Sequence, residues 1–432
     1  MSSLTTAAPP LTEPEVYALR ADFPILGARV NGEPLIYLDS GATSQCPLAV
    51  LDAERDYLLS LNAAVHRGAH TLAAEATELF EDARATVAQF IGAHDDEIVW
   101  TSNATEGVNL VAYAISNASL GRGGAAAERL RIGPGDEIVT TEMEHHANLI
   151  PWQELAARTG ATLRVIPVDD DGALRLDELA TYITDRTRLV AATHVSNVLG
   201  VINPVEQLVE AAHRVGALFL LDACQSAPHL PLDVHTLDID LAVLSGHKML
   251  GPTGIGALYG RREVLEAMPP FLTGGSMITT VTTTEAEYLP PPQRFEAGTQ
   301  RVSQAIALAA AVRYLDGIGM TRIAAHEAEL GRRLVDGLGA IDGVRVLGAG
   351  IDLPRVGLAS IDVEGIHSHD LGQFLDDRGI AVRVGHHCAQ PLHRRLGVTS
   401  STRASTYLYN TRAEVDAVID GVAAAIDFFG RR

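Results

Sequence analysis

Cysteine is scarce in this sequence, and long apolar segments are missing. The 432 residues include three cysteines, too few for a disulfide framework in a chain of this length. No apolar run reaches the roughly 18 residues that a membrane-spanning helix requires. The opening residues, MSSLTTAAPPLTEPEV, have no basic stretch followed by an apolar one and do not resemble a secretory signal. We therefore expect a protein of the reducing cytoplasm, without membrane spans.

Positive charge is also in short supply. Lys and Arg together number 33 against 54 Asp and Glu, which gives a formal net charge of −21. A chain this acidic is a poor partner for nucleic acids or anionic membrane surfaces, and we expect neither. The rest of the composition, 47% hydrophobic and 20% charged, is typical of a globular protein, and the length predicts two domains.

Apolar, strand-like segments alternate with helical ones over most of the chain. The strand-like runs include DEIVW, DEIVTTE, RLVAATHVS, ALFLLDA and DLAVLSG, whereas ATEGVNLVAYAISNA and VEQLVEAAHRVG follow a helical pattern. Continuous apolar strands separated by helices predict an α/β fold whose mostly parallel sheet is covered by helices on both faces. From about residue 313 an Ala-rich helical stretch leads to strands mixed with helices, which predicts a smaller α+β domain.

These textures predict three regions. Residues 1–14, rich in Ser, Thr, Ala and Pro, are expected to form a flexible tail. Residues 36–312 are expected to form the large domain. Residues 15–35 together with 313–432 are expected to form the small domain.

Two of the apolar strands end in residues of opposite charge. DLAVLSG runs into His247 and Lys248, and LFLLD ends at Asp222. In open α/β sheets, ligands bind outside the carboxyl ends of the strands. A lysine there can form a Schiff base, and a buried carboxylate needs a cationic partner. Pyridoxal 5′-phosphate (PLP) uses both groups, the carboxylate for its pyridine nitrogen. Taken alone, Lys248 also fits an ordinary surface loop.

A phosphate-binding helix start is predicted upstream of these strands. DEIVWTSNATEGVNLVAYA reads as strand, turn and helix, with Thr105 at the helix N-terminus. Free N–H groups and the helix dipole favour a phosphate at that position. Ser245 and His247 beside Lys248 are further candidate phosphate ligands. Thr105 equally fits a simple helix cap. The combination of strand ends, helix start, Asp and Lys predicts a PLP site more specifically than any single residue.

The segment GHHCAQPLH, residues 385–393, poses a separate question about Cys388. Its thiol fits a nucleophile, a metal ligand or an apolar filler. Neighbouring histidines favour the reactive thiolate. Adjacent strand residues point to opposite faces, and a Cys and a His separated by four residues are no recognised zinc pattern, so we expect no metal. The histidine pair of EHHAN is likewise interpreted without a metal. We interpret Cys224 as structural and Cys46 as an inert, near-surface residue.

Taken together, these motifs resemble the fold-type I PLP enzymes of the class V aminotransferase family. Within that family the chain is similar to cysteine desulfurases of the Suf type (group II, SufS-like), to which selenocysteine lyases are closely related. The resemblance covers roughly residues 15–428. The stretches that carry it are YLDSGATSQ, AVHRGAHTLAAEAT, EHHANLIPWQ, THVSNVLG, DACQSAPH, SGHKMLGPTGIG, FLTGGSMI, RFEAGT, AVRVGHHCAQPLH and TRASTYLYNT.

The resemblance implies a role in cofactor binding for each matching residue. Lys248 would form the Schiff base with PLP, Asp222 would pair with the pyridine nitrogen, and Gln225 would donate to the phenolic oxygen. His145 would stack over the ring and shuttle protons. The phosphate would be held by the polar residues Thr105, Ser245 and His247, and by Thr299 reaching across from a second subunit, which implies a homodimer.

The resemblance also implies a reaction. L-Cysteine would be converted to L-alanine while Cys388 takes up the sulfur as a persulfide, and L-selenocysteine is the other expected substrate. Asn197 and Arg403 would hold the substrate carboxylate, for which a guanidinium is well suited because it binds bidentately. The sulfur would pass to an acceptor protein of the SufU or SufE type for iron–sulfur cluster assembly.

Two positions depart from the family pattern, and two other hypotheses stay open. The family often has a second Thr where this chain has Ala104, and GTQR replaces the commoner GTP. Another class V enzyme, such as an aminotransferase, an epimerase or a kynureninase-like hydrolase, would keep Lys248 and Asp222 but would not need Cys388. A non-catalytic sulfur-carrier scaffold is the second alternative, against which the complete set of polar residues argues.

Overall fold

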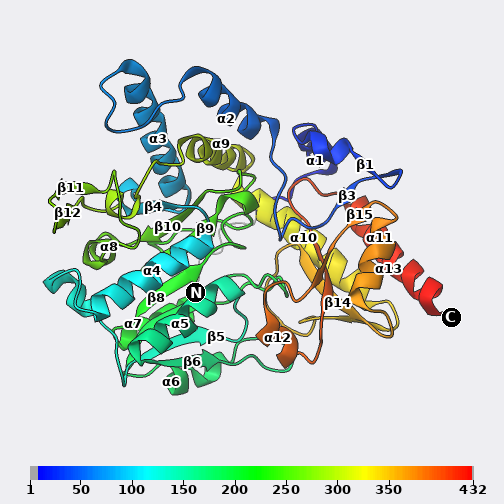
Figure 1. Cartoon of the computed structure of the whole chain (residues 1–432). Helices are drawn as coiled ribbons and strands as arrows, with labels where there is room; N and C mark the ends of the chain where they lie inside the picture. The colour runs from blue at the N-terminus through cyan, green and yellow to red at the C-terminus, as the bar shows by residue number, and fades with distance from the viewer. Residues whose placement is uncertain (1–7, 431–432) are drawn as a thin grey trace.

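The strands of the computed structural model, which describes residues 8–430, gather mainly in two sheets (Figure 1). The larger sheet contains β4 (Ile98–Thr101), β5 (Glu137–Thr141), β6 (Thr162–Ile166), β7 (Thr187–Thr193), β8 (Leu218–Asp222), β9 (Leu241–Ser245) and β10 (Gly256–Gly260). The smaller sheet contains β13 (Val344–Val346), β14 (Leu358–Val363), β16 (Arg383–Gly385) and β17 (Ser401–Ser405). The remaining strands pair two by two and are β1 (Arg29–Val30), β2 (Glu33–Pro34), β3 (Ile36–Tyr37), β11 (Ile278–Val281), β12 (Ala286–Tyr288) and β15 (Ile380–Ala381).

Helices precede, separate and follow these strands. They are α1 (Glu13–Arg20), α2 (Leu48–Ser60), α3 (Thr71–Phe90), α4 (Ala104–Ser119), α5 (Ile150–Thr159), α6 (Leu179–Tyr182), α7 (Val205–Arg214), α8 (Arg262–Ala267), α9 (Val302–Ile318), α10 (Met320–Gly339), α11 (Ser368–Asp376), α12 (Gln390–Arg395) and α13 (Arg412–Gly430). Among the residues that the structure describes, no helix combines the length and the apolar character needed to cross a bilayer.

The larger sheet has the strand order β4-β10-β9-β8-β7-β5-β6. All its pairings are parallel except those of β10, which runs antiparallel to both β4 and β9. Its central strands are mostly apolar because both faces are covered, whereas the edge strand β6 is partly exposed. In β8, for example, Phe219 and Leu221 pack into one hydrophobic cluster and Leu220 into another. Helices α4 and α5 contribute to the second cluster, and α3, α7 and α9 contribute to the first.

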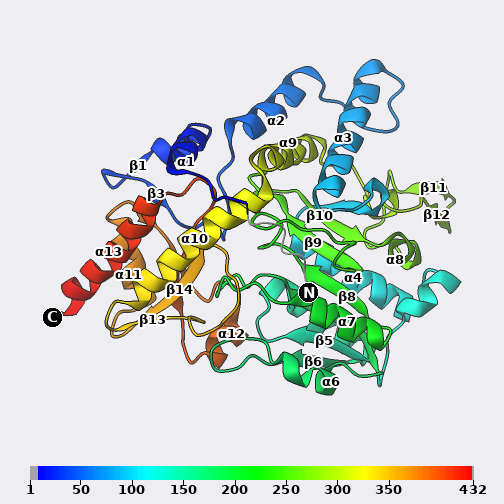
Figure 2. The ribbon, with the colours of Figure 1, turned by 180° about the vertical axis from the view of Figure 1, so that it is seen from behind.

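The smaller sheet is antiparallel, in the order β13-β14-β17-β16. Its strands β13 and β14 lie beside α10, α11 and α13 in Figure 2. Buried residues of α10, α11 and α13 pack against it in a hydrophobic cluster of their own. The prediction of a large, mostly parallel α/β sheet with a smaller α+β unit is therefore confirmed.

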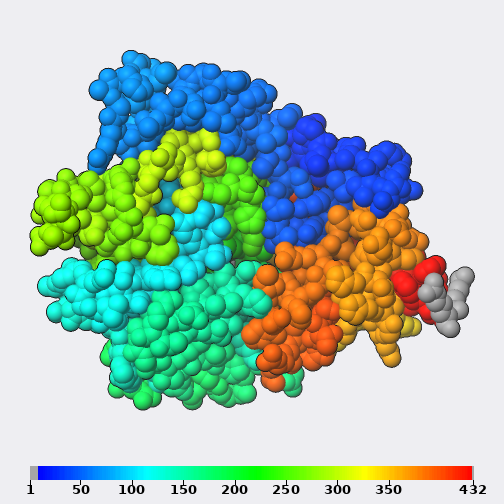
Figure 3. All heavy atoms as spheres, in the orientation of Figure 1, coloured from blue at the N-terminus to red at the C-terminus, as the bar shows by residue number. Residues whose placement is uncertain are grey.

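The domain limits drawn from the sequence stay predictions. Helix α1 begins at Glu13, inside the segment predicted as a tail, and residues 1–7 lie outside the described residues. Strand β3, at the predicted start of the large domain, pairs in parallel with β15 beside the smaller sheet. The segment around α12 lies directly against residues of the large sheet's connections, as the orange and teal surfaces in Figure 3 show. The loop before α12 therefore lies next to loops that connect the strands of the larger sheet.

Candidate active site

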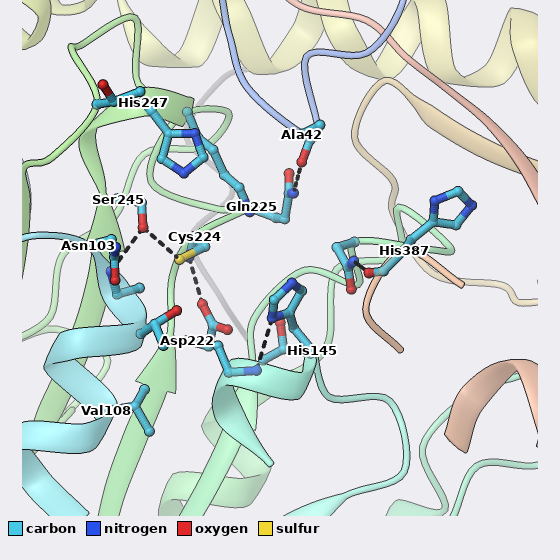
Figure 4. Close-up of a pocket in the computed structure, with 18 of the residues that line it drawn as sticks. Ala42, Asn103, Val108, His145, Asp222, Cys224, Gln225, Ser245, His247 and His387 are labelled. Atoms are coloured by element: carbon cyan, nitrogen blue, oxygen red, sulfur yellow. Dashed lines mark hydrogen bonds between the residues drawn. The ribbon is translucent and has the colours of Figure 1, made fainter. Parts of the chain in front are cut away.

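A cavity of about 420 Å³ lies at the carboxyl ends of β8 and β9 (Figure 4). Most of the residues singled out from the sequence line it, namely Thr105, His145, Asn197, Asp222, Gln225, Ser245, His247, Lys248 and Arg403. Cys388 and Thr299 do not belong to its lining. Segments far apart in the sequence therefore meet at the edge of the sheet where ligands of α/β proteins bind.

Lys248 ends the short 3₁₀ turn, Gly246–Lys248, that follows β9 and is half-buried in the cavity wall. It is also the only lysine of the chain, since the other 32 of the 33 basic residues are arginines. This signal is present in the sequence, where a single lysine stands among 432 residues. The structure thus contradicts the alternative of an ordinary surface lysine.

Asp222 ends β8 and is 6% exposed. Its Oδ1 accepts a hydrogen bond of 3.0 Å from the backbone N–H of Cys224. Cys224 also lines the cavity, 3.7 Å from the Ser245 hydroxyl, and its structural role stays a prediction. Burial raises the pKa of its thiol, which keeps it protonated. Gln225 donates from Nε2 to the Gly41 carbonyl at 2.8 Å, while its buried Oε1 has no partner among the described residues.

The N-terminus of α4 faces the same cavity. Its cap is Asn103, whose Oδ1 accepts from the Glu106 N–H at 3.0 Å, and not Thr105. Ser245 Oγ accepts the N–H of Ala104 at 2.9 Å. The capping interpretation of Thr105 is therefore wrong, and its exposed side chain lines the cavity. The positive end of a 16-residue helix favours an anion here.

The charges in the cavity wall fit PLP. Three cationic side chains, those of Lys248, Arg383 and Arg403, line the cavity with a single carboxylate, Asp222. This excess of positive charge suits a ligand that carries a phosphate together with an amino acid carboxylate. The carboxylate at the strand end suits a protonated pyridine nitrogen. Gln225 differs from its predicted role as a donor to the phenolic oxygen, because its Nε2 donates to Gly41 and the atom left free is the acceptor Oε1.

His145 forms part of the cavity wall as a neutral ring. Its Nδ1 accepts the N–H of Ala147 at 3.0 Å, so the proton of the neutral ring sits on Nε2. Burial, followed by the charge of Lys248, lowers its pKa to about 4. Behind it, Glu144 is fully buried, accepts from the Thr193 N–H at 2.9 Å, and has its pKa raised to about 8 by burial. Sequence reasoning missed Glu144 because nothing in its motif shows how deeply it is buried.

Arg403 lies on β17 and is 1% exposed. Its Nη1 donates to the Asn197 carbonyl at 2.8 Å, and its Nη2 pairs with Asp39 at 3.1 Å. Its Nε has no partner among the described residues, and burial lowers the pKa of the guanidinium to about 10. The Asn197 amide donates to the carbonyl of His387 at 2.6 Å. Asp39, which sequence reasoning also missed, is the internal counterion of Arg403.

Cys388 lies in the loop between β16 and α12, close to the cavity but outside its lining. It is partly exposed, which argues against a buried filler. Its sulfur lies 3.9 Å from Nη2 of Arg383, a cation that stabilises a thiolate. The neighbouring rings of His387 and His393 both hydrogen-bond to the Ser401 hydroxyl, at 3.0 and 2.9 Å.

One cluster elsewhere in the described residues has metal-like composition, formed by His94, Glu97 and His235. Glu97 Oε2 already accepts from the His94 N–H at 3.0 Å and lies 2.9 Å from Nε2 of His235. The three side chains therefore lie together because Glu97 hydrogen-bonds to both histidine residues. Thr299 is exposed and lies outside the cavity of its own chain, so its predicted role toward a second subunit stays a prediction.

The fold and this cavity together define a fold-type I PLP-dependent enzyme. The aminotransferase class-V family profile matches residues 36–418, and the chain belongs to this family.

Named relatives narrow the comparison further. The chain is 56% identical to a probable cysteine desulfurase 2 of Mycobacterium leprae, over 98% of this chain and 99% of the relative. It is 50% identical to a probable cysteine desulfurase of Streptomyces coelicolor, over 98% and 100% of the two chains. Among solved structures, an apo cysteine desulfurase from Thermococcus onnurineus NA1 is similar with a TM-score of 0.88 and 39% identity, covering 98% of this chain and 100% of that one.

Proposed function

We propose that this chain is a PLP-dependent cysteine desulfurase, which converts L-cysteine to L-alanine and collects the sulfur on Cys388. The observation that carries this proposal is the placement of the chain's only lysine beside Asp222, in a cavity bordered by the loop of Cys388. An aminotransferase or a kynureninase-like hydrolase has no use for a partly exposed cysteine next to an arginine at the rim.

Each group of the cavity has a defined task in this reaction. Lys248 and Asp222 hold the cofactor from two neighbouring strand ends, and the start of α4 with Thr105, Ser245 and His247 binds its phosphate. PLP supplies an electron sink that labilises the Cα proton of the bound amino acid. Neutral His145, with its proton on Nε2, would exchange protons with the bound amino acid.

The substrate carboxylate binds at Arg403, next to Asn197. The Cys388 thiolate, paired with Arg383, attacks the sulfur of L-cysteine. An S–S bond forms as the Cβ–S bond breaks, and the electron pair of the broken bond stays on carbon. Protonation of that carbon gives L-alanine, and a persulfide remains on Cys388. The step therefore needs no external oxidant or reductant.

We assign the enzyme to the Suf type, which acts in the cytoplasm as a homodimer and supplies iron–sulfur cluster assembly. Support comes from the motifs shared with that group and from the exposed position of Thr299, which is free to meet a second subunit. The partly exposed Cys388 is accessible to an acceptor protein of the SufU or SufE type. L-Selenocysteine is the second substrate to test.

Product analysis of the purified holoenzyme tests this proposal. With L-cysteine and a thiol reductant, we expect alanine and sulfide in equal amounts. Formation of 3-mercaptopyruvate that depends on an added keto acid would identify an aminotransferase instead. A chain that binds PLP but releases neither product would support the non-catalytic scaffold.

A further inference from the structure

The loop that carries the thiol, residues 386–389, has an unfavourable backbone. His387 and Cys388 are consecutive non-glycine residues in the left-handed region, with φ of 48° and 58°. Side chains with a Cβ rarely adopt this conformation, and two in succession persist only when surrounding contacts enforce them. We call residues 386–389 the thiol loop. Its shape must be imposed by its neighbours.

Three hydrogen bonds reach the thiol loop and the first residue of α12 from the connections of the large sheet. The Asn197 amide donates to the His387 carbonyl at 2.6 Å. The backbone N–H of His146 donates to the Cys388 carbonyl at 2.7 Å. The backbone N–H of Gln390 donates to Nε2 of the His146 ring at 3.2 Å. His146 thus makes two of the three bonds, both to the chain that follows the Cys388 side chain, whereas Asn197 holds the chain that precedes it.

We propose that His146 is a positioning residue, which fixes the Cys388 thiol relative to the cofactor cavity by clamping the thiol loop. Only the expected effect on kcat rests on the proposed function, because the clamp itself is tested without substrate. His146 follows directly after His145, which lines the cavity. One rigid turn, His146–Asn148, therefore sets both the cavity wall and the sulfur-accepting loop.

The ring of His146 can accept from Gln390 while it is neutral. Burial, followed by the charge of His386, lowers its pKa, which favours that neutral form. The ring bond can be removed without touching the backbone bond to Cys388. Substitution of His146 therefore removes the bond to Gln390 and leaves the bond to the Cys388 carbonyl in place.

Four forms of the holoenzyme test the clamp: wild type, His146→Ala, His146→Gln and, as a control in the same loop, His386→Ala. Glutamine can place an amide oxygen near the position of Nε2 and accept again from Gln390. The His386 side chain is exposed, and the bond of the His146 ring goes to Gln390. Replacement of His386 should therefore leave this ring bond in place. Amide hydrogen exchange at Gln390 and the alkylation rate of Cys388 are measured without substrate.

We expect His146→Ala to speed exchange at Gln390 and alkylation of Cys388 by about 2- to 12-fold, the range of one lost hydrogen bond. His146→Gln should restore both, and His386→Ala should leave exchange at Gln390 unchanged. With L-cysteine, kcat should fall in His146→Ala by a similar factor, while KM and the cofactor spectrum stay at wild-type values. Unchanged exchange and alkylation in His146→Ala would overturn the clamp. A wild type without desulfurase activity but with the expected exchange pattern would overturn the proposed function and leave the clamp standing.

Discussion

At the scale of single residues, Lys248 offers a chemical handle that few proteins have. It holds the only side-chain amine of the chain, so reagents that react with lysine meet no background beyond the N-terminus. Lys248 lines the same cavity as Asp222, the position that the proposed role as cofactor ligand requires.

We predict that Lys248→Ala abolishes covalent attachment of PLP. Borohydride reduction of the wild type should fix the cofactor on the peptide that contains Lys248, and the variant should carry none after denaturation. Lys248→Arg serves as the control, because it keeps the positive charge but cannot form a Schiff base. Reduced cofactor retained by Lys248→Ala would show that the amine has been assigned wrongly.

The sequence predicted those candidate site residues that lie next to a recognisable local pattern in the chain. Asp222 and Lys248 follow apolar strands, and Arg403 lies within a recognisable motif. Asp39 and Glu144 were out of reach because their importance depends on contacts between distant segments and on burial. Asp39 meets Arg403 across 364 positions of the chain, a pairing that no local pattern encodes.

At the scale of elements, β17 links the substrate side of the cavity to the smaller sheet. Arg403 lies opposite Ser360 of β14 and Arg383 of β16 in the strand register. The two arginines therefore belong to adjacent strands, one in contact with the thiol and one beside Asp39. The sequence predicted strands mixed with helices in this region, but their register follows from side-chain packing and was not readable.

We predict that Arg403→Ala raises the KM for L-cysteine by at least about tenfold and leaves the PLP spectrum unchanged. Loss of a charged hydrogen bond costs about 1.5–3 kcal/mol, which appears as weaker substrate binding. Arg403→Lys should rescue poorly because lysine lacks the bidentate fork. Steady-state kinetics decide the matter. An unchanged KM together with loss of the cofactor band would make Arg403 a structural residue.

At the scale of the whole molecule, buried neutral histidines tie stability to pH. Burial lowers the pKa of His194 to about 4, and burial followed by the charge of Lys248 does the same for His247, both from an ordinary value of 6.5. The unfolded chain binds these protons below pH 6.5, whereas the folded chain does not. The contribution of these two histidines to stability is therefore complete above that pH and is lost as the pH falls toward about 4.

We predict that the urea midpoint of unfolding falls steadily between pH 6.5 and about 4. His194→Phe, which removes one titrating group and its unpartnered Nδ1, should make the dependence shallower by up to about 1.4 kcal/mol per pH unit. A slope identical to that of the wild type would contradict the assignment of a neutral His194.

The homodimer is a second expectation at this scale. We predict that Thr299→Ala leaves the fold and the dimer intact but weakens PLP binding by about 2- to 12-fold, through loss of one hydrogen bond to the phosphate. Sedimentation measures the dimer, and cofactor titration measures the affinity. PLP binding equal to that of the wild type would remove Thr299 from the phosphate site.

The most direct measurement is peptide mass spectrometry of the holoenzyme after exposure to L-cysteine without a reductant. Cys46 and Cys224 provide internal controls, because burial raises the pKa of the Cys46 thiol to about 11 and also raises the pKa of the Cys224 thiol. Cys388, in contrast, lies beside Arg383. We predict one additional sulfur atom on the peptide of Cys388, none on the other two, and one molecule of alanine for each persulfide formed. Sulfur on Cys46 or Cys224, or alanine formed at the wild-type rate by Cys388→Ser, would contradict the role of Cys388 as the sulfur acceptor.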